Sequence, residues 1–266
     1  MGIPIFPILR ERLTEIDNEL RERFGLTLQT AEFNPKKASI LFEYFVLYNV
    51  VLSVDPDELR IDLRRRSGPP YLPLPGVKYW KTAGRFGDIL EPSIVARREK
   101  DTYNFWFDRP LLYFVKGEEA SARPDIVVRK GQFEFRDLAF SQEKVQLLRE
   151  GELIAETGIA SLSSIPKEES GYTVLVPSYD WEQKVSYFKF RDEFIHPPLI
   201  IECKSYGAVL GNIDRYASHA ETVVVVTPEK LYEPKKPNIH VLKIQNKRQL
   251  SNQELRQKVT SFLLAL

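Results

Sequence analysis

PPLIIECK, residues 197–204, is the stretch of sequence on which the fold prediction rests. Its three consecutive aliphatic residues are typical of a buried central strand. Such a strand does not normally end in a glutamate and a lysine unless these charges face a cleft. Because side chains alternate between the two faces of a strand, Glu202 and Lys204 project to the same face, roughly 6.5–7 Å apart. The stretch therefore predicts a buried strand that carries a carboxylate and an ammonium group side by side.

The residues that follow have the strongest α/β pattern in the chain. A helix is expected over 208–220, then a buried strand over 222–228 and another over 239–244. Strands that flank a helix in this way are expected to be parallel and joined by a right-handed crossover. Ser251 and Glu254 then form a capping-box pattern at the start of a final helix.

The N-terminal half begins with helices and continues with strands. Residues 8–24 carry apolar side chains at spacings of three and four, and 36–52 are apolar nearly all round, with Glu43 as the one acidic residue. Prolines and glycines predict a loop over 55–78. Further strands are predicted at 111–116, 125–130, 132–137, 172–179 and 184–194, with a short helix over 141–150.

A second carboxylate lies at the start of an aliphatic strand. Residues 122–128 read ARPDIVV, so Asp125 directly follows Pro124, which fixes the approach of the chain. Mg²⁺ prefers a small number of carboxylates and keeps several waters, so Asp125 and Glu202 would suffice to hold it. Lys204 could then orient or deprotonate the attacking water, or stabilise the charge of the transition state.

Asp125 and Glu202 lie far apart along the chain, which leaves two arrangements open. Either residues 131–197 form an inserted lobe, or a nearer strand is the partner of the Glu202 strand. In the second case the segment 184–192 would pair with it, and Asp192 would be a rival ligand. We prefer Asp125, because it begins a clean aliphatic strand after a proline.

The two motifs together, R-P-D before aliphatics and then I-I-E-C-K, resemble the bipartite signature of the PD-(D/E)xK nuclease superfamily, as in restriction endonucleases and archaeal Holliday junction resolvases. The resemblance covers residues 36–52, 110–130 and 199–244. It implies an α/β fold with a mixed central sheet flanked by helices, in which an αβββαβ core places Asp125 and the Glu-x-Lys pair on neighbouring strands. To this core the chain would add an N-terminal helical segment and a β-rich insertion.

The resemblance also implies three supporting residues. Many members carry a glutamate on the first core helix that faces the metal, and Glu43 is the candidate here. One branch has Gln-x-x-x-Tyr on the helix after the Glu-x-Lys strand, and this chain has Asn212 and Tyr216 at that spacing. Residues four apart share a helix face, so both could reach Lys204 or a phosphate.

The sequence-based prediction is a metal-dependent DNA nuclease, with an endonuclease favoured. Residues 1–35 would form the helical segment and 36–266 the nuclease-like domain. The cofactor would be Mg²⁺, with Mn²⁺ as a substitute, and the partner would be DNA. The lobe at 131–197 could serve substrate choice or homodimerisation. A DNA-binding scaffold that lost catalysis and a nuclease directed at RNA stay as alternatives.

Composition limits the remaining classes. Thirty-eight basic and thirty-seven acidic residues give a formal charge of +1, so any charge that binds DNA must be local. Cys203 is the single cysteine, which excludes a disulfide framework and four-cysteine metal sites. The apolar stretch at the N-terminus is too short for a signal peptide or membrane span, so a cytoplasmic protein without membrane contact is expected.

Overall fold

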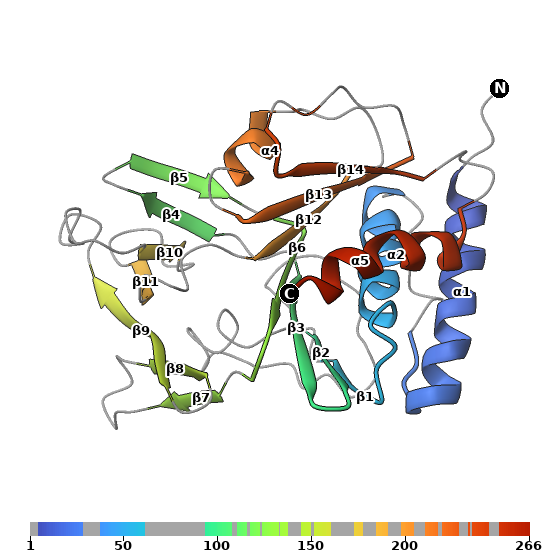
Figure 1. Cartoon of the computed structure of the whole chain (residues 1–266), viewed down its shortest axis with the longest axis horizontal. Coiled ribbons are helices and arrows are strands. Elements are labelled where there is room, and N and C mark those ends of the chain that lie inside the picture. Colours follow the sequence, from blue (N-terminus) through green and yellow to red (C-terminus); the bar gives the residue numbers. More distant parts are fainter. Residues whose placement is uncertain are drawn as a thin grey trace.

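Two β-sheets and the helices around them make up the described part of the chain in the computed structural model (Figure 1). The structure describes residues 5–28, 38–61, 94–107, 111–115, 118–122, 124–132, 134–137, 145–149, 152–160, 173–177, 185–190, 198–204, 211–217, 220–228, 234, 236–244 and 250–266.

The first sheet, called here the core sheet, has seven strands in the order β1-β2-β3-β6-β12-β13-β14. Strands β1 to β12 in this order pair antiparallel, whereas β12, β13 and β14 pair parallel. The fold is therefore α/β with a mixed open sheet, as predicted. The strands are β1 (Glu58–Ile61), β2 (Ile94–Arg98), β3 (Asp101–Phe107), β6 (Ile126–Lys130), β12 (Leu199–Cys203), β13 (Thr222–Thr227) and β14 (Ile239–Lys243).

Three helices cover one side of the core sheet. These are α1 (Ile5–Phe24), α2 (Ala38–Leu52) and α5 (Asn252–Leu264), and α2 packs against α1, α5 and β12. The apolar stripe of α1 is fully buried against α2, and α5 begins where the Glu254 N–H donates to the Ser251 hydroxyl at 3.3 Å. Figure 1 shows the short helix α4 (Gly211–Tyr216) away from these three, beside the second sheet.

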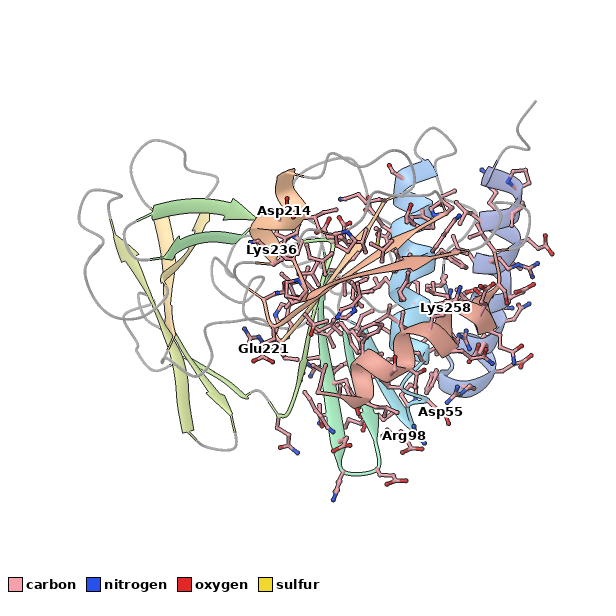
Figure 2. The ribbon with its side chains drawn as sticks, turned by 45° about the horizontal axis from the view of Figure 1, so that its top comes forward. Asp55, Arg98, Asp214, Glu221, Lys236 and Lys258 are labelled. Atoms are coloured by element: carbon pink, nitrogen blue, oxygen red, sulfur yellow. The ribbon has the colours of Figure 1, made fainter. Side chains whose placement is uncertain are left out.

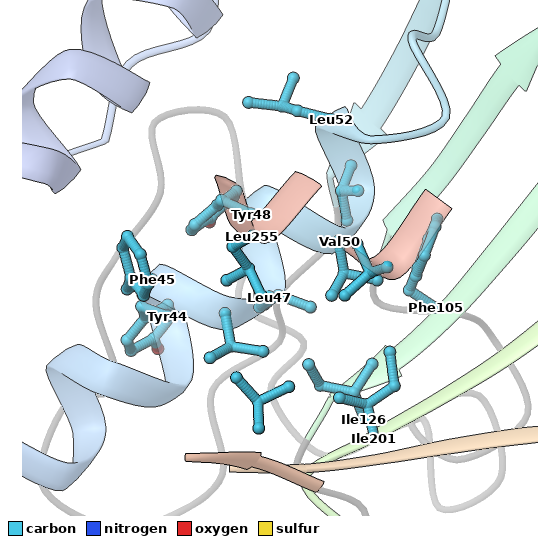
Figure 3. Close-up of a cluster of buried hydrophobic side chains, with 14 of the residues drawn as sticks. Tyr44, Phe45, Leu47, Tyr48, Val50, Leu52, Phe105, Ile126, Ile201 and Leu255 are labelled. Carbon is cyan, nitrogen blue, oxygen red and sulfur yellow. The ribbon is translucent and has the colours of Figure 1, made fainter. Parts of the chain in front are cut away.

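Strand alternation assigns each side chain of β12 to one face. Leu199, Ile201 and Cys203 belong to the apolar core that α2 and α5 close, and Ile201 lies near Leu47 and Val50 of α2 in Figure 3. Side chains at the even positions therefore point to the opposite face, which carries Glu202 and Lys204. The predicted shared face of these two residues agrees with the structure.

The second sheet is antiparallel throughout and has the order β5-β4-β10-β11-β9-β8-β7. The chain enters it twice, once between β3 and β6 and once between β6 and β12, and β4 pairs with β10 to join the two excursions. Its strands are β4 (Leu111–Val115), β5 (Glu118–Ala122), β7 (Glu134–Asp137), β8 (Val145–Arg149), β9 (Glu152–Ala160), β10 (Thr173–Pro177) and β11 (Val185–Phe190).

Several sequence predictions need correction. The expected helix over 141–150 is wrong, because β8 occupies part of it and pairs with β7 and β9. The strand at 111–116 forms as β4 but lies in the second sheet, not in the core sheet. The expected loop at 55–78 contains β1. Of the helix predicted over 208–220, the structure describes α4 with a turn at Ala217 after it, and residues 208–210 lie outside the described residues. Among the described residues, no helix is long and apolar enough to cross a membrane.

Candidate active site

Asp125 and Glu202 meet where the pairing of two core strands ends. β6 and β12 pair antiparallel, and the last partners in their ladder are Ile126 and Ile201. One residue further, in the same register, lie Asp125 and Glu202. The two carboxylates are far apart in the sequence, and the pairing of β6 with β12 brings them together at one end of these two central strands.

Side chains replace the ladder hydrogen bonds at this point. The Asp125 backbone N–H donates to Glu202 Oε1 at 3.2 Å, and the Cys203 N–H donates to Asp125 Oδ2 at 2.7 Å. Pro124 has no N–H to donate to the ladder. The two carboxylates accept from the N–H groups of Asp125 and Cys203, where backbone carbonyls would accept in a regular ladder. Each acidic side chain is therefore fixed by the backbone of the opposite strand.

Lys204 completes the cluster. Its Nζ donates to Glu202 Oε2 at 2.6 Å and lies 3.9 Å from Asp125 Oδ2. The Lys204 N–H donates to the Val226 carbonyl of β13 at 2.9 Å, so its backbone is held by the parallel ladder. One ammonium group thus faces two carboxylates, and the cluster has one surplus negative charge when all three groups are ionised.

Burial makes this surplus unfavourable. The Glu202 side chain is 1% exposed, while those of Asp125 and Lys204 are 18% and 26% exposed. Burial, and then the charge of Asp125, raise the pKa of Glu202 to about 8, against the opposing effect of Lys204. Burial alone would lower the pKa of Lys204, but the charges of Glu202 and Asp125 outweigh it and raise that pKa. The cluster therefore favours an extra proton or cation.

Glu43 lies on α2, near the same end of the core sheet. Tyr44 packs its ring on Phe107 at 5.2 Å, which places the start of α2 beside the end of β3. Burial and then the charges of Asp125, Glu43 and Glu202 raise the pKa of Cys203, so Glu43 is within electrostatic reach of the thiol. Cys203 and α2 share the core face, whereas Glu202 points away from it.

The donor set suits a hard cation through two carboxylates. Among the described residues, no group of three or more His, Cys, Asp or Glu side chains lies together in a way that could hold a metal ion. Glu43 as a third ligand stays a prediction. Mg²⁺ is commonly held by one or two carboxylates together with water and substrate oxygens. Asp125 and Glu202, with their surplus charge, fit such an ion.

The other predicted site residues lie on α4 or outside the description. Asn212 belongs to α4, but its side chain is outside the described residues, and Tyr216 is 5% exposed. Lys236 donates to the Asp214 carbonyl at 2.8 Å and so anchors α4; Figure 2 labels both residues side by side. Asp192 is outside the described residues.

The rival strand pairing is wrong. β11, which covers most of the segment 184–192, pairs with β9 and β10 in the second sheet and not with β12. The partner of β12 on that side is β6, as the preference for Asp125 required. The sequence did not reveal that the backbone N–H of Cys203 donates a hydrogen bond to the Asp125 carboxylate. Only the register of β6 against β12 reveals it.

Comparison with known proteins adds no further information: no protein-family model, curated protein or solved structure matches this chain. Its function has to be inferred from the geometry of the cluster formed by Asp125, Glu202 and Lys204.

Proposed function

We propose that this protein is a metal-dependent DNA nuclease of the PD-(D/E)xK type, and that it acts as an endonuclease. The order of elements supports the proposal: α2, β3, β6, β12, α4 and β13 occur in this order along the chain, as in an αβββαβ core, with β1, β2 and the two excursions added between them. β12 pairs with β6 on one side and with the parallel β13 on the other.

One observation carries the proposal. Asp125, Glu202 and Lys204 come from two separate motifs, yet their charged groups lie within hydrogen-bonding or ion-pair distance on adjacent strands. A charge pair at a strand end is common by chance. Two buried or partly buried carboxylates that share one lysine are costly to stability, and such clusters are concentrated at functional sites.

The chemistry follows from the three groups. Mg²⁺ held by Asp125 and Glu202 would supply a Lewis acid for a phosphate oxygen and lower the pKa of a bound water. Glu202 is fixed by the Asp125 N–H and by Lys204, so its oxygens cannot turn away from the site. The partly exposed Lys204 ammonium can orient the attacking water or stabilise negative charge on the phosphate. The Asp125 carboxylate is partly exposed as well, so a substrate phosphate could approach the ion from that side.

The test is cleavage by the full chain of supercoiled plasmid, linear duplex and single-stranded RNA, each with Mg²⁺, Mn²⁺ or EDTA. Nicking or linearising of the plasmid with Mg²⁺ or Mn²⁺, but not with EDTA, is the expected result. Release of nucleotides from linear ends alone would make it an exonuclease. Absence of cleavage with every metal, in a folded preparation that binds DNA, would favour a scaffold protein and contradict the proposal.

A further inference from the structure

A row of three side chains crosses the carboxyl ends of the parallel strands. The Lys204 N–H donates to the Val226 carbonyl, which extends the β12–β13 ladder one residue beyond the Cys203–Val226 pair. Thr227, the next residue of β13, pairs with Lys243 of β14. Lys204, Thr227 and Lys243 therefore occupy neighbouring positions on three adjacent strands. In open α/β sheets this carboxyl edge is where ligands bind.

Lys243 projects from the same face as Lys204. On β14, the His240 ring packs on Phe262 of α5 at 5.1 Å, and Leu242 packs against the apolar core that α5 closes. Because side chains alternate along a strand, Lys243 points to the opposite face, which is the face of the candidate site. Two independent contacts on β14 thus agree on the orientation.

Spacing and exposure suit a nucleic acid strand. Two steps between neighbouring strands put the Cα atoms of Lys204 and Lys243 about 10 Å apart. This distance corresponds to about three nucleotide steps at the axial rise of one DNA strand. Thr227, between the two lysines, is 1% exposed, whereas Lys243 is exposed to solvent. The row thus has one lysine engaged with carboxylates and a second one at the surface.

We propose that Lys243 binds a backbone phosphate of the same DNA strand whose scissile phosphate lies at Lys204. This inference rests on the proposed nuclease function and adds a substrate contact to it. A point charge on a phosphate contributes to affinity for any sequence and releases one counterion on binding. Lys243 therefore contributes to DNA binding and leaves the chemical step to the cluster at Asp125 and Glu202.

The experiment measures duplex binding by the full chain in EDTA, so that no strand is cut, over a range of salt concentrations. In the wild type, log K falls as log salt rises. In Lys243→Gln this negative slope should become shallower by about 0.9, and Lys243→Arg should keep the wild-type slope. Lys100→Gln is the matched control. It removes an exposed lysine from the turn between β2 and β3, at the opposite edge of the core sheet, and should leave the slope unchanged.

Three results would overturn the inference: an unchanged slope in Lys243→Gln, an equal loss in Lys100→Gln, or no duplex binding by the wild type. In the cleavage assay with Mg²⁺, Lys243→Gln should raise KM and leave kcat within about twofold, since uniform binding alone is lost. A wild type that binds with the expected slope but never cleaves would contradict the nuclease proposal while the phosphate contact of Lys243 stands.

Discussion

Two groups of lysine and carboxylate side chains lie at opposite ends of the central strands of the core sheet, and they differ in their balance of charge. At one end Lys130 contacts Asp101 at 3.1 Å, with side chains 30% and 39% exposed. At the other end Lys204 contacts Glu202 at 2.6 Å, and Asp125 lies close to the same ammonium. The Lys130 pair has one ammonium for one carboxylate, and both side chains are partly exposed to solvent. The Lys204 cluster has two carboxylates for one ammonium, and one of them is buried.

This difference separates an ordinary strand-end ion pair from a candidate site. The hydrogen bond from Lys130 to Asp101 raises the pKa of the lysine, so the pair favours the charged ammonium. In the Lys204 cluster, burial and Asp125 raise the pKa of Glu202 instead. Both carboxylates also join β6 to β12 through backbone N–H groups, but this bridging leaves their surplus negative charge unbalanced. The cluster is suited to bind a cation, and the Lys130 pair is not.

The largest expected effect is on cleavage. We expect Lys204→Ala to lower the rate of plasmid nicking by about 10²–10⁴-fold, because it removes a group placed to act on water or on the phosphate. Lys130→Ala is the control and should cleave at the wild-type rate. Circular dichroism and duplex binding would show that both variants are folded. Wild-type nicking by Lys204→Ala would remove the lysine from the mechanism.

Metal binding should distinguish the two ends next. We expect Mg²⁺ to raise the melting temperature of the wild type. At a concentration 100-fold above Kd, the bound ion should add about 2.7 kcal/mol to the free energy of unfolding. Asp125→Asn and Glu202→Gln should each lose most of this shift, and the double variant should be little worse than either single one. Asp101→Asn should keep it. A full shift in Asp125→Asn would show that this carboxylate does not hold the ion.

The pH dependence of stability follows from the raised pKa of Glu202. In the unfolded chain this carboxyl has its ordinary pKa of 4.5, whereas in the folded protein its pKa is about 8. Between these values the folded state binds more protons, so the metal-free protein should lose stability as pH rises, by up to about 1.4 kcal/mol per pH unit. Thermal unfolding in EDTA from pH 5 to 8 measures this, and Glu202→Gln should flatten the curve relative to Asp101→Asn. Equal slopes in these two variants would contradict the assignment.

The smallest effect belongs to the exposed pair. Because solvent screens it, replacing Lys130 with Gln should change the free energy of unfolding by less than about 1 kcal/mol at neutral pH. Urea unfolding with and without added salt would measure it. A loss of several kcal/mol would mean that the pair at this end is structural, and that exposure is a poor guide to the difference between the ends.

The core of the site could be predicted from local sequence patterns. Three aliphatic residues before Glu202 predicted a buried strand, and alternation placed Lys204 on the same face. Asp125 was predicted from a proline followed by aliphatic residues, and the pairing of β6 with β12 agrees with that choice. These predictions held because each depends on the residue and its immediate neighbours.

Predictions that depend on partners failed. Residues 145–149 carry Val145, Leu147 and Leu148, a spacing that fits a helix as well as a strand, and pairing with β7 and β9 decides for the strand. The run at 111–115 is a strand as predicted, yet nothing within it shows that it pairs with β5 and β10. The role predicted for Glu43 is of a different kind: it depends on how α2 packs on the core sheet, and it stays a prediction.

The two excursions into the second sheet have a consequence for folding kinetics. Asp125 and Glu202 are separated by 77 positions. If those residues stayed a flexible coil, the length-dependent part of closing the loop would be about 4 kcal/mol. Once β7 to β11 have formed their sheet, these five strands already shorten the coil that remains to be closed, and β4 ties them to the segment before Asp125 through β10. The carboxylates should therefore meet late in folding, after the second sheet, and a chain with a weakened second sheet would be slow to bring Asp125 and Glu202 together.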